Sequence, residues 1–114
     1  MYYYKTEVLR VVDGDTVDVR MDLGFNVWHK CRVRLLGINA PESRTRDLEE
    51  KKRGLAAKAF LIEVLETAQS DIELQSHGTG KYGRVLGEFY INGVNINDLM
   101  VKEGHAVKYD GGKR

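Results

Sequence analysis

One stretch decides the fold: Asp13-Gly-Asp-Thr-Val-Asp-Val-Arg-Met21. Its first three residues are typical of a tight turn, because Asp and Gly tolerate the backbone angles that turns require. From Thr16 onward, polar and apolar residues alternate, which is the pattern of a strand with one buried face. Residues 4–12, before the turn, are rich in Tyr, Thr and Val. The two segments together predict a β-hairpin, with a bulge near Val8 and Leu9, where the alternation slips.

The same alternation continues after a second turn at residues 22–24. Residues 27–36 form a further predicted strand, with Val33 and Leu35 on its apolar face. Residues 43–53 are polar and lack a period, which predicts a mobile loop leading into a helix. From about residue 54 to residue 68, apolar residues recur every three or four positions, so a helix is expected there.

Two further strands are predicted at residues 71–75 and 84–91. A turn at Asn92-Gly93 follows, and then a second helix that Asn95 caps and Gly104 ends. The order of three strands, a helix, two strands and a helix predicts a mainly β (α+β) fold, a five-stranded OB-fold barrel with two or more helices. Because one core typically serves 50 to 200 residues, we expect residues 1–114 to form a single domain.

Composition excludes several classes of protein. The chain has 18 Lys and Arg against 17 Asp and Glu, so a polyanion would have to be held by a local cluster of basic residues. The single Cys31 excludes an internal disulfide and a cysteine-rich zinc site, and we expect it to be a small buried apolar residue. No stretch approaches the roughly 20 apolar residues of a membrane span, and no membrane partner is expected. The start of the chain lacks the pattern of a secretory signal, which predicts an intracellular protein or the processed form of a secreted one.

Three segments carry polar residues that a barrel does not require: 13–16, 34–42 and 81–84. Asp15, Asn39 and Glu42 supply oxygen atoms that suit a hard cation such as Ca²⁺ or Mg²⁺. Arg34 and Arg84 supply guanidinium groups that suit a phosphate. If the segments converge, they hold the parts of a phosphodiester hydrolase. Taken singly, the first segment could equally be a plain hairpin turn and the third a solvated basic turn.

The three segments resemble the motifs of the staphylococcal nuclease family. The resemblance rests on Val12-Asp-Gly-Asp-Thr-Val17, Arg34-Leu-Leu-Gly-Ile-Asn-Ala-Pro-Glu42 and Lys81-Tyr-Gly-Arg84, in this order, and it covers roughly residues 5–109. It implies an OB-fold barrel and Ca²⁺-dependent cleavage of DNA and RNA, in which the bond between the 5′-oxygen and phosphorus breaks and 3′-phosphates remain. A single-stranded substrate and a monomeric protein are expected.

The resemblance also implies a role for each matching residue. Asp15, the Asn39 side chain and the backbone carbonyl of Ala40 would bind Ca²⁺, with Asp13 close by. Glu42 would orient or deprotonate the attacking water, and the catalytic arginines, Arg34 and Arg84, would hold the scissile phosphate. The remaining matches would lie beside the bound nucleotide: Lys81, Tyr82 and Tyr109.

The chain departs from the family pattern at the metal site. The family has Asp where this chain has Asn39, so one negative charge is missing, and affinity for a divalent cation is expected to fall. Ala40 replaces a threonine but keeps the backbone carbonyl. His77 and His105 are expected to face solvent, and Trp28 is interpreted as a partly buried anchor in preference to a base-stacking platform.

Two functions therefore remain for the sequence. The first is a metal-dependent nuclease. The second is a catalytically inactive module with the same barrel that binds nucleic acid or a protein partner. Arg34, Glu42 and Arg84 together favour the nuclease, because a binding module does not need all three, whereas Asn39 favours the binding module.

Overall fold

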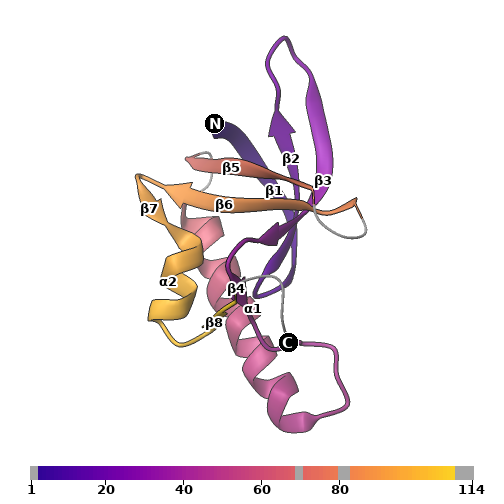
Figure 1. Ribbon diagram of the computed structural model, residues 1–114, viewed down its shortest axis with the longest axis vertical. Helices are drawn as coiled ribbons and strands as arrows, with labels where there is room; N and C mark the ends of the chain where they lie inside the picture. Colours follow the sequence, from indigo (N-terminus) through magenta and orange to yellow (C-terminus); the bar gives the residue numbers. More distant parts are fainter. Residues whose placement is uncertain (1–2, 69–70, 80–82, 110–114) are drawn as a thin grey trace.

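The computed structural model describes residues 3–68, 71–79 and 83–109. Its elements, in chain order, are β1 (Tyr3–Asp13), β2 (Thr16–Asp22), β3 (Trp28–Leu35), β4 (Ile38–Asn39), α1 (Leu48–Ala68), β5 (Ile72–Thr79), β6 (Val85–Ile91), β7 (Val94–Asn95), α2 (Ile96–Lys102) and β8 (Val107–Lys108). The main sheet has the strand order β3-β2-β1-β5-β6-β7, and β3 also pairs with β6 in parallel. This last pairing closes the five long strands into a barrel, as predicted for an OB fold (Figure 1).

The alternating residues of β2 and β3 form much of the core. Val17 and Val19 of β2 and Val33 and Leu35 of β3 are fully buried, and the aromatic ring of Phe89 from β6 lies in the same cluster. The register between β1 and β2 shifts between Val8 and Arg10, which confirms the predicted bulge. The buried face that the period-two pattern predicts is therefore the inside of the barrel.

The outer half of the β2–β3 hairpin extends beyond the barrel (Figure 1). His29 is on the same face of β3 as Val33, yet it is exposed, because no other strand covers this end of the hairpin. The prediction that Cys31 is buried was wrong: the side chain is half-buried, at the boundary between the barrel and the free end of the hairpin. Partial burial, together with the nearby Asp18 carboxylate, raises the pKa of the Cys31 thiol.

Helix α1 begins six residues earlier than the sequence pattern indicated. The prediction of a loop over 43–53 was wrong from Leu48 onward. Asp47 precedes the helix, and its carboxylate accepts hydrogen bonds from the backbone N–H groups of Glu49 and Glu50, at 3.0 and 3.2 Å. This is an N-terminal cap, and it stabilises a first turn whose one apolar residue, Leu48, is exposed.

Small residues on α1 let the helix approach the site loops closely. A Cβ atom at Gly54 would lie 2.2 Å from the carbonyl oxygen of Glu42, and one at Gly14 would lie 2.8 Å from the Cβ of Ala57. Ala57 and Leu61, further along the same face, are fully buried. The α1 backbone therefore packs directly against the β1–β2 turn and the segment after β4.

Helix α2 has the predicted boundaries. The Asn95 side chain accepts a hydrogen bond from the N–H of Asp98 at 3.0 Å, and Gly104 has the positive φ of 80° that favours glycine after a helix. The sequence did not predict the two-residue strands β4, β7 and β8, which exist only through pairing with distant segments. Within the described part of the chain, no helix is long and apolar enough to cross a membrane.

Candidate functional site

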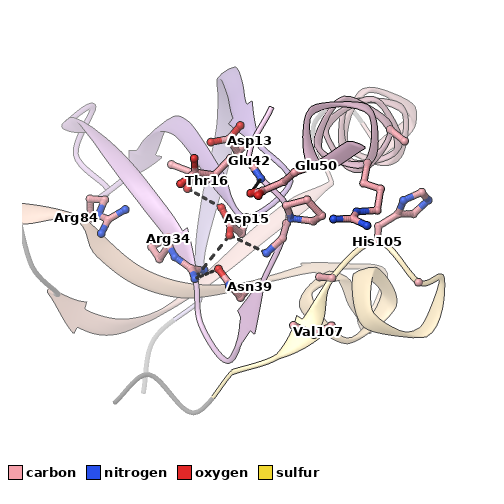
Figure 2. A pocket seen from close by; sticks show the side chains of 16 residues that line it. Asp13, Asp15, Thr16, Arg34, Asn39, Glu42, Glu50, Arg84, His105 and Val107 are labelled. Atoms are coloured by element: carbon pink, nitrogen blue, oxygen red, sulfur yellow. Dashed lines mark hydrogen bonds and ion pairs between the residues drawn. The ribbon is translucent and has the colours of Figure 1, made fainter. Parts of the chain in front are cut away.

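A cleft of about 790 Å³ opens beside the β1–β2 turn (Figure 2). Five separate segments line it: the turn itself, the end of β3, residues 39–42, the first turns of α1, and residues 104–107, with Arg84 before β6 completing the wall. The charged side chains in the lining are Asp13, Asp15, Glu42, Glu50, Arg34, Arg53 and Arg84. Four carboxylates therefore face three guanidinium groups across one cavity.

Asp15 lies at the centre of the cleft and is almost fully buried. One carboxylate oxygen accepts a hydrogen bond from the N–H of Ala40 at 2.9 Å, and the other accepts one from the Thr16 hydroxyl at 3.0 Å. The Asp15 carbonyl also accepts a hydrogen bond from the N–H of Leu35 at 2.8 Å. These contacts fix the carboxylate between the start of β2 and the segment after β4.

Arg34 extends from β3 toward this carboxylate, as Figure 2 shows. Its guanidinium group donates to the carbonyl of Leu35 at 2.8 Å and to the side-chain oxygen of Asn39 at 3.3 Å, and it lies 3.6 Å from an Asp15 oxygen. The guanidinium carbon is 5.9 Å from the centre of the Tyr109 ring, within the range of a cation–π contact. The guanidinium plane is therefore held in position by several neighbours.

Glu42 and Asp13 are connected through Ser43. Asp13 accepts hydrogen bonds from both the backbone N–H and the hydroxyl of Ser43, a buried residue. The Glu42 N–H donates to a Glu50 oxygen at 3.2 Å. In the described ranges, no hydrogen bond or ion pair engages the Glu42 carboxylate, whose residue is exposed at the edge of the cleft.

Arg84 reaches the cleft from the position just before β6. Since β3 and β6 run in parallel with Val33 opposite Val85, Arg84 lies close to β3, and it lines the cleft together with Arg34. Lys81 and Tyr82, which the sequence placed beside the nucleotide, lie outside the described residues. The structure thus brings together all the other predicted site residues: Asp13, Asp15, Arg34, Asn39, Ala40, Glu42 and Arg84 line the cleft, and Tyr109 contacts Arg34.

The cleft contains carboxylate and amide oxygens, which are the type of ligand that a hard cation binds. The side-chain oxygens of Asp15 and Asn39 both lie near the same Arg34 nitrogen, at 3.6 and 3.3 Å, so they point toward one positively charged group. Within residues 3–68, 71–79 and 83–109, no cluster of three His, Cys, Asp or Glu side chains is arranged to hold a metal ion. A cation here would therefore need an amide or backbone oxygen among its ligands, as Asn39 and Ala40 can provide.

Sequence reasoning missed two groups of cleft residues. Glu50 and Arg53 were assigned to a loop, although their spacing of three positions, following the Asp47 cap, would have indicated one helix face. The expectation that His105 faces solvent was also wrong. Its imidazole stacks on the Phe60 ring of α1 at 4.6 Å and lines the cleft, since the chain turns back toward α1 after α2.

These features define a class of proteins: OB-fold barrels that carry a cleft lined by carboxylates and arginines. Comparison with known proteins identifies a family within this class. The family model described as "Staphylococcal nuclease homologue" matches residues 32–113. The chain is 33% identical over 115 residues to the micrococcal nuclease of Shigella flexneri, covering 93% of this chain and 59% of that protein. It is 31% identical over 99 residues to the thermonuclease of Staphylococcus intermedius, covering 87% and 56%.

The chain belongs to the staphylococcal nuclease family, as its three motifs indicated. A protein of Bacillus anthracis without a described activity is also similar, at 36% identity over 104 residues, covering 90% of this chain and 46% of that protein. The chain spans about half the length of these curated relatives.

Proposed function

We propose that this protein is a metal-dependent nuclease that hydrolyses phosphodiester bonds of DNA and RNA. The observation that carries the proposal is the cleft itself, in which Arg34 contacts both Asp15 and Asn39, and Glu42 and Arg84 share the lining. Relatives named micrococcal nuclease and thermonuclease support the same reaction class.

Arg34 and Arg84 are proposed to bind the scissile phosphate. A guanidinium group offers a planar fork of N–H donors that matches two phosphate oxygens, and it keeps its charge at any physiological pH. Because Arg34 is already held by Leu35 and Asn39, little rotational freedom is lost when it meets the phosphate. Donors fixed in this way stabilise the charge that develops in the transition state.

Glu42 is the proposed general base. Its backbone is held on two sides, by the Ser43–Asp13 hydrogen bonds and by the close approach of Gly54, while its carboxylate remains open to the cleft. Such a carboxylate can orient a water molecule and accept its proton as the water attacks phosphorus. We infer that the leaving group is the 5′-oxygen, so that 3′-phosphate ends remain.

Asp15, the Asn39 side chain and the Ala40 carbonyl are the proposed Ca²⁺ ligands, with Asp13 anchoring the neighbouring loop. A bound divalent cation would supply Lewis-acid polarisation of the phosphoryl oxygen and partial neutralisation of its charge. Tyr109, with Lys81 and Tyr82, is proposed to lie beside the nucleotide. We propose a single-stranded substrate and a monomeric enzyme.

A digestion of single-stranded DNA tests the proposal. We expect cleavage with millimolar Ca²⁺, little with Mg²⁺ and none in EDTA, and a phosphatase should release phosphate from the 3′ ends of the products. Arg34→Lys keeps the charge but loses the fork and should lower turnover, whereas Arg46→Lys, at an exposed position outside the cleft, should not. Full cleavage in EDTA would contradict the metal assignment.

The second candidate function is a binding module without catalysis. Asn39 is the observation that favours it, because one carboxylate fewer weakens a cation site. The same digestion separates the two functions: binding of the DNA without cleavage under any divalent ion would establish the module.

A further inference from the structure

The free end of the β2–β3 hairpin presents an unusual set of exposed apolar residues. Phe25 is fully exposed, and Leu23, Val27 and Trp28 are 44%, 51% and 39% exposed. The interpretation of Trp28 as a partly buried anchor was therefore wrong, because the barrel does not cover this end of β3. Phe25 and Asn26 have positive φ angles of 54° and 62°, although an aromatic residue rarely adopts this conformation. Backbone hydrogen bonds of 2.9 Å join Leu23 to Val27 and Val27 to Gly24, so the tip is an ordered turn. Apolar residues clustered in this way are typical of a binding surface.

Strand β3 connects this tip with the cleft. Side chains two positions apart share one face of a strand, so Trp28, Lys30, Arg32 and Arg34 form a single row, which we call the β3 row. Arg34, at one end, lines the cleft, and Trp28, at the other, adjoins the tip. At roughly 3.3 Å per residue, the row is about 20 Å long.

Ion pairs hold the arginines of the row in place, while Lys30 keeps its positive charge unpaired among the described residues. Arg32 donates to Asp18 at 2.8 and 3.2 Å, which holds its guanidinium group against β2. Arg20 is paired with Glu7 at 2.7 Å and lies over the Trp28 ring at 4.3 Å. Lys30 makes no ion pair with any residue that the structure describes. On this face of β2 and β3, four basic residues outnumber the two acidic ones, Asp18 and Asp22.

We propose that the β3 row binds single-stranded nucleic acid, with phosphates along Lys30 and Arg32 and bases stacked on Trp28 and Phe25. This combination of a basic track and aromatic side chains is what sequence-tolerant binding of single strands requires, because every base has a stacking face. The inference rests on the proposed function for its substrate class and extends that substrate well beyond the cleft. At 3.4 Å per stacked nucleotide, the row accommodates about six nucleotides.

The surface beyond Trp28 marks where nucleic acid bound along the β3 row is expected to end. A cavity of about 360 Å³ adjoins the indole, and its lining includes the carboxylates Glu7, Asp22, Asp71 and Glu73. Phosphate groups are repelled there, so the strand ends at the tip. A membrane surface is the competing partner for exposed aromatic residues. The row favours nucleic acid because its basic residues lead into the cleft instead of surrounding the tip.

Trp28 provides the measurement, because it is the only tryptophan of the chain. The proposed experiment is a titration of the protein with the oligonucleotides dT10 and dT2, in EDTA and low salt, followed by indole fluorescence. We expect dT10 to quench the fluorescence by stacking and dT2 to have little effect. Phe25→Ala and Lys30→Gln should each raise the Kd for dT10 about fivefold or more. The matched controls Val94→Ala and Lys102→Gln, at exposed positions on β7 and α2, should leave it unchanged.

The outcomes separate this inference from the nuclease proposal. Equal quenching by dT2 and dT10, or an unchanged Kd for both hairpin variants, would overturn the β3 row. Quenching by phosphatidylserine vesicles without any response to dT10 would assign the tip to membranes and also overturn it. Length-dependent quenching without cleavage in Ca²⁺ supports the row and refutes only the nuclease, since binding is measured without metal.

Discussion

At the scale of single residues, Glu42 is the sharpest test of the chemistry. Glu42→Gln keeps the size and a hydrogen-bonding oxygen but removes the base, so turnover should fall by roughly 10²- to 10⁴-fold with little change in nucleotide binding. Single-turnover digestion measures the rate of cleavage, and a titration in EDTA measures nucleotide binding. Glu49→Gln, one residue from Glu50 but outside the cleft, is the control. Turnover close to that of the parent would remove Glu42 from the mechanism.

Asn39 is the residue that departs from the family pattern. Asn39→Asp places a second carboxylate beside Arg34 and Asp15, and cation affinity in oxygen-ligand sites rises with ligand charge. Since a ligand that binds only the folded state raises its stability, Ca²⁺ should increase the Tm of the variant more than that of the parent. Asn26→Asp makes the same charge change at the hairpin tip and should respond as the parent does. Equal Ca²⁺ shifts for Asn39→Asp and parent would place Asn39 away from the metal.

At the scale of elements, the packing of α1 against the Glu42 segment depends on Gly54. Replacing glycine by alanine inside a helix normally stabilises it by about 1 kcal/mol. At Gly54 the added Cβ would lie 2.2 Å from a backbone oxygen, so the expected sign is reversed, with a loss of about 1–3 kcal/mol in the free energy of unfolding. Urea denaturation measures it. Ala59→Gly, at an exposed position of the same helix, measures the ordinary difference in helix propensity between alanine and glycine. A Gly54→Ala variant that is more stable than the parent would contradict the close contact.

The β2–β3 hairpin makes a prediction about acid sensitivity. The hydrogen bonds from Arg32 are the largest cause that holds the pKa of Asp18 below its ordinary value of 3.8. The folded state therefore binds this proton more weakly than the unfolded state does. The resulting stability is present above pH 3.8 and is lost as the pH falls through the folded pKa.

Asp18→Asn should consequently cost stability at pH 7 and less at a pH below the Asp18 pKa. Denaturation curves of variant and parent at pH 7 and in acid measure this difference. Asp71→Asn, at an exposed position without an ion pair among the described residues, should show a smaller dependence. A difference from the parent that stays constant with pH would mean that the Arg32 contact does not form in solution.

At the scale of the whole molecule, Asn97 joins the elements that carry the site. Its buried side chain donates to the carbonyls of Leu36 and Gly87, at 2.9 and 3.0 Å, and accepts from the N–H of Phe89 at 3.2 Å. It therefore links α2 to β6 and to the loop that follows β3. Asn97→Ala removes all three hydrogen bonds, although the Gly87 carbonyl keeps the one it accepts from the Leu36 N–H, and it should cost about 2 kcal/mol of the free energy of unfolding. Thermal unfolding measures the loss, and Glu66→Ala, at an exposed position of α1, is the control.

The features that the amino-acid sequence predicted correctly are local. Alternation predicted the strands, the three-to-four spacing predicted most of α1, and Asn95 and Gly104 marked the ends of α2, because these patterns depend on neighbours within a few residues. The motifs also named the residues that line the cleft. The Asp47 cap, followed by the single apolar residue Leu48 and then by five polar residues, was too weak a signal to place the start of α1.

Which of these segments meet depends on the three-dimensional packing of the chain. The parallel pairing of β3 with β6 brings Arg84 into the same cleft as Arg34, and the pairing of β4 with β8 carries His105 back to the cleft and Tyr109 to Arg34. The burial of Cys31 depended on where the barrel ends along β3, and the anchoring of Glu42 depended on contacts with Asp13 and Gly54. Such contacts join residues 12 to 70 positions apart, and no local period records them. They form because closing the barrel buries the apolar faces that each strand alone would leave in water.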